Sequence, residues 1–150
     1  MKNIFEAATT NEIIARINKL TPETQPLWGK MDAAKMLAHC CVTYEMVYTN
    51  KHPKANGFKR FMLNLLVKPG VVNEKPYPKN SRTAPQFIIA DQRVFETEKT
   101  RLIDFLQQTQ SFGAAHLDGK ESNSFGAMTI GEWNNQFYKH LDHHLTQFGV

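Results

Sequence analysis

Three of the six histidines of this chain stand within five residues, at His140, His143 and His144. Histidines four positions apart on a helix lie one above the other on the same face, with Cβ atoms about 5–6 Å apart. At that spacing two imidazoles can bind one transition metal, and a third from another helix would complete the set. His39, which follows an apolar run about a hundred residues earlier, is the candidate for that third ligand.

The helical repeat separates the three clustered histidines. With His144 at zero, His140 falls at about −40° and Trp133 at about −20°, in the middle of the apolar face, whereas His143 falls at about −100°, on its flank. A buried polar group without a partner costs about 1–3 kcal/mol. The two inward histidines are therefore either metal ligands or core residues hydrogen-bonded to each other or to carboxylates, and their spacing favours a metal.

His39 lies on a mixed side of its own helix. Met36 and Val42 share that side, but so do Asp32 and Lys35. Such a mixture fits a residue at the edge of a cavity, and it also fits an ordinary flank histidine. Periodicity alone leaves both interpretations of His39 open.

Three neutral imidazoles form a ligand set that Zn, Ni, Cu or Fe accepts, with Mn a further candidate. Three protein ligands leave a coordination position for water or substrate, as in catalytic zinc sites. Further partners must fix the imidazole tautomers. Glu98, Asp104 and Gln147 are the candidates for that role.

Four helical segments are expected to position these residues. The first carries Ile13, Ile14 and Ile17 at helical spacing, with Thr9 and Glu12 as a possible capping box. The second is expected to run from its N-cap near Asp32 to about Thr49, the third from near Asp91 to about Gln110. The fourth starts at Thr129, with Glu132 completing a capping box, and ends at Gly149.

About forty residues separate the second and third of these helices. Phe58 to Lys68 is expected to form a short amphipathic helix closed by Pro69-Gly70, and Val71 to Gln86 an extended segment. No strand pattern of comparable length competes. We therefore expect an all-α fold, a four-helix bundle with one long, partly helical crossover between helices 2 and 3.

Length and composition bound the class of protein. The chain of 150 residues is 41% hydrophobic and 21% charged, as expected for a single globular domain spanning residues 1–150. No apolar run approaches the roughly 20 residues that span a bilayer, and the first residues lack the apolar region of a signal peptide. The expected location is cytoplasmic. Adjacent Cys40 and Cys41 form no disulfide framework and are expected to be small buried helix residues rather than thiolate ligands.

The net charge of +4 is unevenly distributed. Residues 51–90 carry one acid, Glu74, and eight basic side chains: Lys51, Lys54, Lys59, Arg60, Lys68, Lys75, Lys79 and Arg82. Such a band can attract nucleic acid, anionic lipid or an acidic substrate, or it can be a solvated connection. Aromatic residues are not interleaved with the charges, so we expect a solvated segment and neither a nucleic-acid nor a membrane partner.

The order of these motifs resembles the DinB-like, or YfiT-like, superfamily of metal-dependent helical enzymes. It combines Met36-Leu37-Ala38-His39, a long crossover and a final helix with His-x-x-His-His. The similarity is greatest to a branch without an assigned reaction, in the stretches from Gly126 to Trp133 and from His140 to Gly149, and it extends from about Trp28 to Gly149.

The resemblance implies a metal held by His39, His140 and His144, with His143 outside the ligand set. Members of the superfamily include transferases of low-molecular-weight thiols, such as bacillithiol or mycothiol, and thiol-dependent isomerases, and dimers are common. We therefore expect a metal-dependent transferase or hydrolase that activates a thiol or water and acts on a small molecule. A low-molecular-weight thiol is a candidate co-substrate, and a homodimeric assembly is expected. The alternative is a non-catalytic metal-binding or stress-response protein.

Overall fold

The computed structural model describes residues 1–150 and is mostly helical, as predicted. Four long helices dominate: α1 (Ala7–Asn18), α2 (Ala33–Tyr48), α5 (Phe95–Phe112) and α6 (Ile130–Gln147). The smaller elements are α3 (Gly57–Leu66), α4 (Lys68–Val72), two 3-10 turns, η1 (Pro85–Phe87) and η2 (Ala114–Leu117), and an antiparallel pair of two-residue strands, β1 (Glu121–Ser122) and β2 (Gly126–Ala127). None of the helices is both long and apolar enough to cross a membrane.

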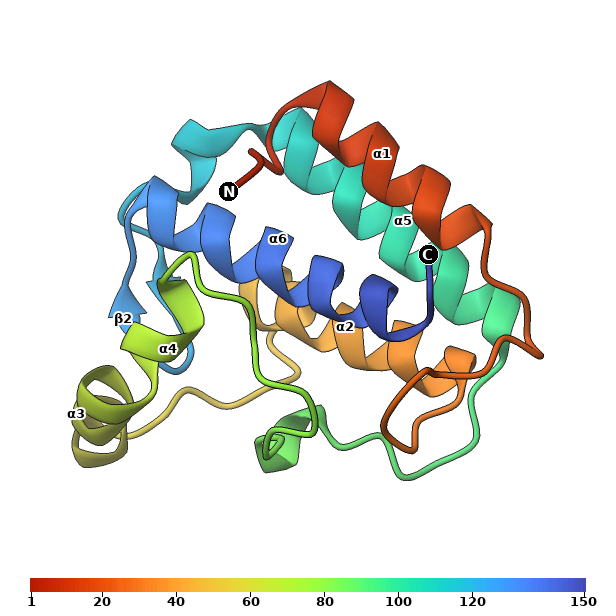
Figure 1. Ribbon diagram of the computed structural model, residues 1–150. Helices are drawn as coiled ribbons and strands as arrows, with labels where there is room; N and C mark the ends of the chain where they lie inside the picture. Colours follow the sequence, from red (N-terminus) through yellow and green to blue (C-terminus); the bar gives the residue numbers. More distant parts are fainter.

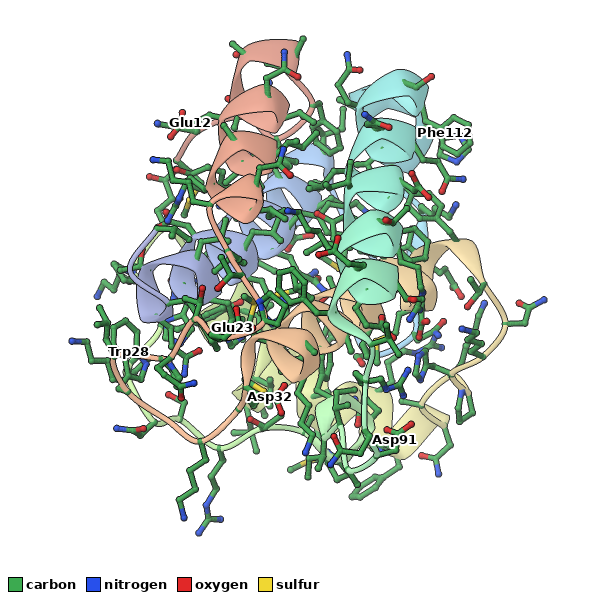
Figure 2. The ribbon with its side chains drawn as sticks, turned by 90° about the vertical axis from the view of Figure 1, so that its right-hand side faces the viewer. Glu12, Glu23, Trp28, Asp32, Asp91 and Phe112 are labelled. Atoms are coloured by element: carbon green, nitrogen blue, oxygen red, sulfur yellow. The ribbon has the colours of Figure 1, made fainter.

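The four long helices surround one apolar core. Helix α2 packs against α5 and α6, and α1 packs against the same two helices, so each long helix has two long neighbours. In Figure 1, α6 crosses in front of α2, while α1 and α5 run together at the upper right. Figure 2 shows the same α1–α5 pair from the side, with Glu12 and Phe112 on its outer flanks. The facing sides of α2 and α6 are thereby brought together.

Both histidine-bearing helices begin at the predicted residue. The Asp32 side chain accepts a hydrogen bond from the backbone N–H of Lys35 at the start of α2. At the start of α6, Thr129 and Glu132 form a reciprocal capping box. These caps satisfy backbone N–H groups that have no partner within the helix. The caps thus fix where α2 and α6 begin. Counted from these starts, the helical repeat determines which residues lie on the inner faces.

The predicted start of the first helix was wrong. Helix α1 begins at Ala7, and its N-cap residue, Glu6, makes no side-chain cap. Thr9 is buried within the helix, and the carboxylate of Glu12 instead accepts hydrogen bonds from Lys2 Nζ at 2.6 Å. The chain before the helix is held down by burial of Ile4, so the start is set by packing rather than by a cap.

The third long helix, in contrast, starts later than predicted. Helix α5 begins at Phe95, because the carboxylate of Asp91 binds the side chain of Arg93 at 3.1 Å instead of capping the helix.

The crossover contains the predicted helix, here α3, but Pro69-Gly70 does not close it. Both residues lie inside α4, where proline in the first turn needs no backbone N–H. Helix α4 is fastened to α6, since Lys139 Nζ donates to the carbonyl oxygens of Gly70 and Asn73 and Asn135 donates to that of Val72. From α4 the chain runs without a helix or strand, through a turn at residues 79–80, to η1, which contacts α2.

Candidate metal centre

The structure brings His39 of α2 together with His140 and His144 of α6. One ring nitrogen from each lies within 4.8 Å of those of the other two, a grouping that could hold a metal ion. The ring centroids are 4.6–4.9 Å apart. His39 and His144 are only 4% and 8% exposed, and His140 is partly buried. The four-residue spacing on α6 thus gathers the two imidazoles as predicted, and α2 supplies the third.

His39 presents an unprotonated nitrogen to His140. Its Nδ1–H donates to the carbonyl oxygen of Phe87 in η1 at 2.9 Å, and a carbonyl can only accept. In the neutral ring Nε2 therefore carries a lone pair, and this atom lies 2.9 Å from Nε2 of His140. A carbonyl oxygen on one ring nitrogen, which leaves the other free, is a common arrangement for metal-binding histidines.

His140 has a partner that can act in either direction. The hydroxyl of Thr43, one turn after His39 on α2, lies 3.0 Å from Nδ1 of His140. A hydroxyl can donate to an unprotonated Nδ1, which puts the proton of His140 on Nε2, pointing at His39. It can also accept from a protonated Nδ1, which frees Nε2 to bind a cation. Thr43 is therefore compatible with both the metal-free and the metal-bound ring.

The third histidine is oriented by a chain of hydrogen bonds. His144 Nδ1–H donates to Gln147 Oε1 at 2.8 Å, and Gln147 Nε2 donates to the carbonyl oxygen of Trp28 at 2.7 Å. Because the Trp28 carbonyl can only accept, the glutamine amide is turned so that its oxygen faces His144. Gly29 has a φ of +87°, and a Cβ there would lie 2.5 Å from Gln147 Nε2. The loop before α2 thus leaves the room that this amide needs.

Burial keeps all three imidazoles neutral. It lowers the pKa of His39, lowers that of His140 well below its ordinary value, and lowers that of His144 to about 3, with the neighbouring histidines as a further cause for His140 and His144. A metal binds the unprotonated nitrogen, so these shifts favour metal binding at neutral pH.

His143 lies outside this group, as the helical repeat predicted. Its ring packs edge-on against Trp28 and Tyr77, with centroids 5.9 Å and 5.7 Å away, and it lines a cavity of about 310 Å³. Lys79 lines the same cavity and holds its ammonium 4.3 Å from the Trp28 ring. The cavity is adjacent to the three candidate ligand residues, because the ring centroids of His143 and His144 lie 5.1 Å apart.

Of the three predicted orienting residues, only Gln147 contacts a candidate ligand. Glu98 is buried but forms ion pairs with Arg93 and Arg101, and Asp104 is exposed. The residues that orient His39 and His140, Phe87 and Thr43, were not predicted. Phe87 acts through its backbone carbonyl, which no side-chain pattern reports.

The two cysteines and the two remaining histidines lie outside the histidine group. Cys40 and Cys41 are buried, and burial raises the pKa of Cys40 well above its usual value and that of Cys41 to about 12, so neither is a thiolate. His116 is exposed, whereas His52 is half-buried and donates to the Glu45 carboxylate at 2.9 Å.

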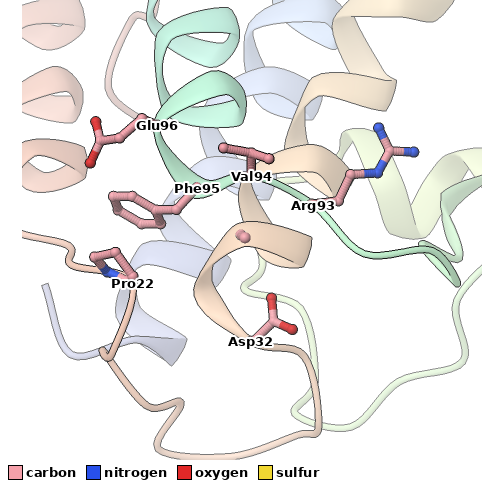
Figure 3. A pocket seen from close by; sticks show the side chains of 7 residues that line it. Pro22, Asp32, Arg93, Val94, Phe95 and Glu96 are labelled. Atoms are coloured by element: carbon pink, nitrogen blue, oxygen red, sulfur yellow. The ribbon is translucent and has the colours of Figure 1, made fainter.

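A larger cleft of about 480 Å³ lies elsewhere, between the start of α5 and the segment before α2. Figure 3 shows its lining, which contains no histidine: Pro22, Asp32, Ala34, Arg93, Val94, Phe95 and Glu96. Its one cationic group, Arg93, is already paired with Asp91 and Glu98. This cleft offers no comparable set of converging groups.

No protein-family model, curated protein or solved structure matches the chain.

Proposed function

We propose that the protein is a metal-dependent enzyme in which His39, His140 and His144 hold one divalent transition metal. The observation that carries the proposal is that three buried, neutral imidazoles converge while each uses its other nitrogen for a hydrogen bond to a different partner. Zinc or nickel suits such a set best, and Fe, Cu or Mn are accepted by similar ligands.

A metal in this set would supply a Lewis acid that lowers the pKa of a bound water or thiol. The chain's own residues hold the three rings in place and exclude solvent from His39 and His144. The cavity beside His143 would receive a small-molecule substrate, and Lys79 there offers a cation for a carboxylate. Transfer of a low-molecular-weight thiol, or hydrolysis, is the reaction class that these groups suit. We also propose that the chain is a member of the DinB-like superfamily of four-helix bundles, and the order of its histidine motifs in the sequence supports this.

The ligand set is tested by the metal content of the purified protein. Single substitutions His39→Ala, His140→Ala and His144→Ala should each reduce the bound metal, measured by elemental analysis, to a small fraction of the wild-type value. His143→Ala, next to a ligand on the same helix, is the matched control and should keep its metal. Full occupancy in all three ligand variants would refute the site.

Catalysis is tested separately, by incubating metal-loaded protein with a low-molecular-weight thiol and a panel of electrophiles or esters. Turnover should be lost in His144→Ala and retained in His116→Ala, whose side chain is exposed and distant in sequence from the site. One observation favours the second candidate, a non-catalytic metal-binding protein: no carboxylate is hydrogen-bonded to any of the three histidines. Metal binding without turnover on the whole panel would support that alternative.

A further inference from the structure

Helix α3 exposes an unusual concentration of apolar side chains. Of the twelve large apolar residues that are exposed in the whole chain, six lie between residues 58 and 67: Phe58, Phe61, Met62, Leu65, Leu66 and Val67. Phe58 is 79% exposed, Phe61 63% and Leu65 61%. An exposed apolar patch of this kind marks an interaction surface more often than chance scatter does.

Five of these side chains, those from Phe58 to Leu66, form one stripe that faces solvent. From Phe58 at zero, Phe61 falls at about −60°, Met62 at about +40° and Leu65 at about −20°. The opposite side of the helix carries Leu63, which packs against the core, and Arg60, whose guanidinium lies 3.8 Å from the Glu121 carboxylate. The helix is therefore amphipathic, but it turns its more apolar side away from the protein.

Helix α3 lies at the periphery of the molecule, away from the four long helices (Figure 1). Hydrogen bonds and a salt bridge nevertheless hold it in place through α4. It leads directly into α4, which Lys139 and Asn135 fasten to α6 through backbone carbonyls. The side chain of Lys68 adds a salt bridge of 2.8 Å to Glu132. The stripe is thus presented in a fixed orientation by the same helix that carries two of the candidate ligands.

The net positive charge of the segment that contains the stripe favours an anionic partner. Residues 51–90 hold eight basic side chains and one acid, and Lys59, Lys75 and Arg82 are exposed and form no salt bridge. A symmetric contact between two copies would place the same patch against itself and bring two such positive segments together. An anionic partner gains from the same charges, so charge complementarity argues against self-association through α3.

We propose that α3 docks the protein on an anionic lipid surface, with the stripe from Phe58 to Leu66 in the interface plane and the basic segment over the headgroups. A convex helix with aromatic and aliphatic side chains needs no preformed groove in a fluid bilayer, whereas a protein partner would have to supply one. Amphipathic helices flanked by lysine bind membranes in this way. This differs from the solvated role expected for residues 51–90 from the sequence.

The test is co-sedimentation of the full-length, metal-loaded protein with vesicles. Wild type should bind vesicles of phosphatidylcholine mixed with phosphatidylglycerol and bind vesicles of phosphatidylcholine alone far more weakly. The double substitution Phe61→Gln and Leu65→Gln should weaken binding roughly tenfold or more, and Lys59→Gln roughly fivefold. The matched control, Leu27→Gln with Val94→Gln, removes two apolar side chains of similar exposure elsewhere and should bind as wild type does.

Circular dichroism shows whether each variant keeps its helices, so that loss of binding is not mistaken for unfolding. Equal binding by the stripe variant and the control would overturn the proposal, as would no binding to anionic vesicles at low salt. A concentration-dependent dimer that disappears in the stripe variant, without vesicle binding, would also overturn it and assign α3 to contact between copies. Metal content is not involved in any of these outcomes, so they are independent of the proposed function.

Discussion

Nε2 of His39 and Nε2 of His140 lie 2.9 Å apart, although 101 residues separate them in the sequence. Nδ1–H of His39 is already donated to Phe87, so its Nε2 can offer only a lone pair. Two lone pairs at this distance repel each other, and the contact needs a proton on His140 or a cation between the rings. A metal between the rings would accept both lone pairs, so His39 and His140 would hold it through their Nε2 atoms.

Replacing Gln147 should weaken metal binding without unfolding the protein. In Gln147→Ala, His144 loses the acceptor for its Nδ1–H, and we expect metal affinity to fall by about 10- to 100-fold. Competition with a chromophoric chelator measures this change. Gln136→Ala, on the same helix but without a hydrogen bond to any candidate ligand, is the control, and an equal loss in both variants would contradict the role of Gln147.

Substitution of Gly29, which contacts none of the three histidines, should also weaken metal binding. In Gly29→Ala the new Cβ would lie 2.5 Å from Gln147 Nε2, and φ of +87° is unfavourable for alanine by about 1–2 kcal/mol. The amide must move, and its bonds to Trp28 and His144 are lost. We expect lower metal affinity and a lower melting temperature. Gly131→Ala, where a Cβ meets nothing within 4 Å, should leave metal affinity unchanged.

Thr43 should matter through its hydroxyl rather than its shape. Thr43→Val keeps the volume but leaves Nδ1 of His140 without a partner, at a cost of about 1–3 kcal/mol in the stability of the metal-free protein. Metal affinity should also fall, by roughly tenfold. Thr43→Ser retains a hydroxyl and should recover most of both losses. If serine and valine behave alike in denaturation and metal titration, the hydrogen bond has no such role.

The metal-free protein should lose stability in mild acid. Burial lowers the pKa of His144 from 6.5 to about 3, so below about pH 6.5 the unfolded chain takes up a proton that the folded chain does not. The contribution of the neutral histidines to the free energy of unfolding is therefore fully present above about pH 6.5. It is lost as the pH falls towards 3, by up to about 1.4 kcal/mol per pH unit for each such histidine.

Urea denaturation at a series of pH values, in the presence of a chelator, measures this slope. His144→Leu should flatten it. A stability that is constant between pH 6.5 and pH 5 would contradict the neutral, buried state of these rings.

The placement of the histidines was predictable where it depends on one helix. The helical repeat of α6 placed His140 and His144 inward and His143 on the flank. The capping residues Asp32 and Thr129 predicted where α2 and α6 begin. Gln147 was predicted as an orienting residue because it lies one turn from His144. These inferences all use local spacing, which the sequence states directly.

The remaining features depend on tertiary contacts. Glu98 was a reasonable partner for an imidazole by type, but Arg101 and Arg93 bind it. Thr9 and Glu12 have capping-box spacing, yet burial of Ile4 starts α1 earlier. Phe87 was not found because its contribution is a backbone carbonyl, which every residue has. Only the path of the crossover decides which carbonyl meets His39.

The distribution of the histidines over α2 and α6 has a consequence for the life of the chain. A metal held by both helices would be a cross-link that closes a loop of about a hundred residues, and such a link restricts the unfolded chain strongly. Loss of the metal would then raise the unfolded fraction and expose the chain to proteases. The abundance of the protein would then depend on the supply of its metal.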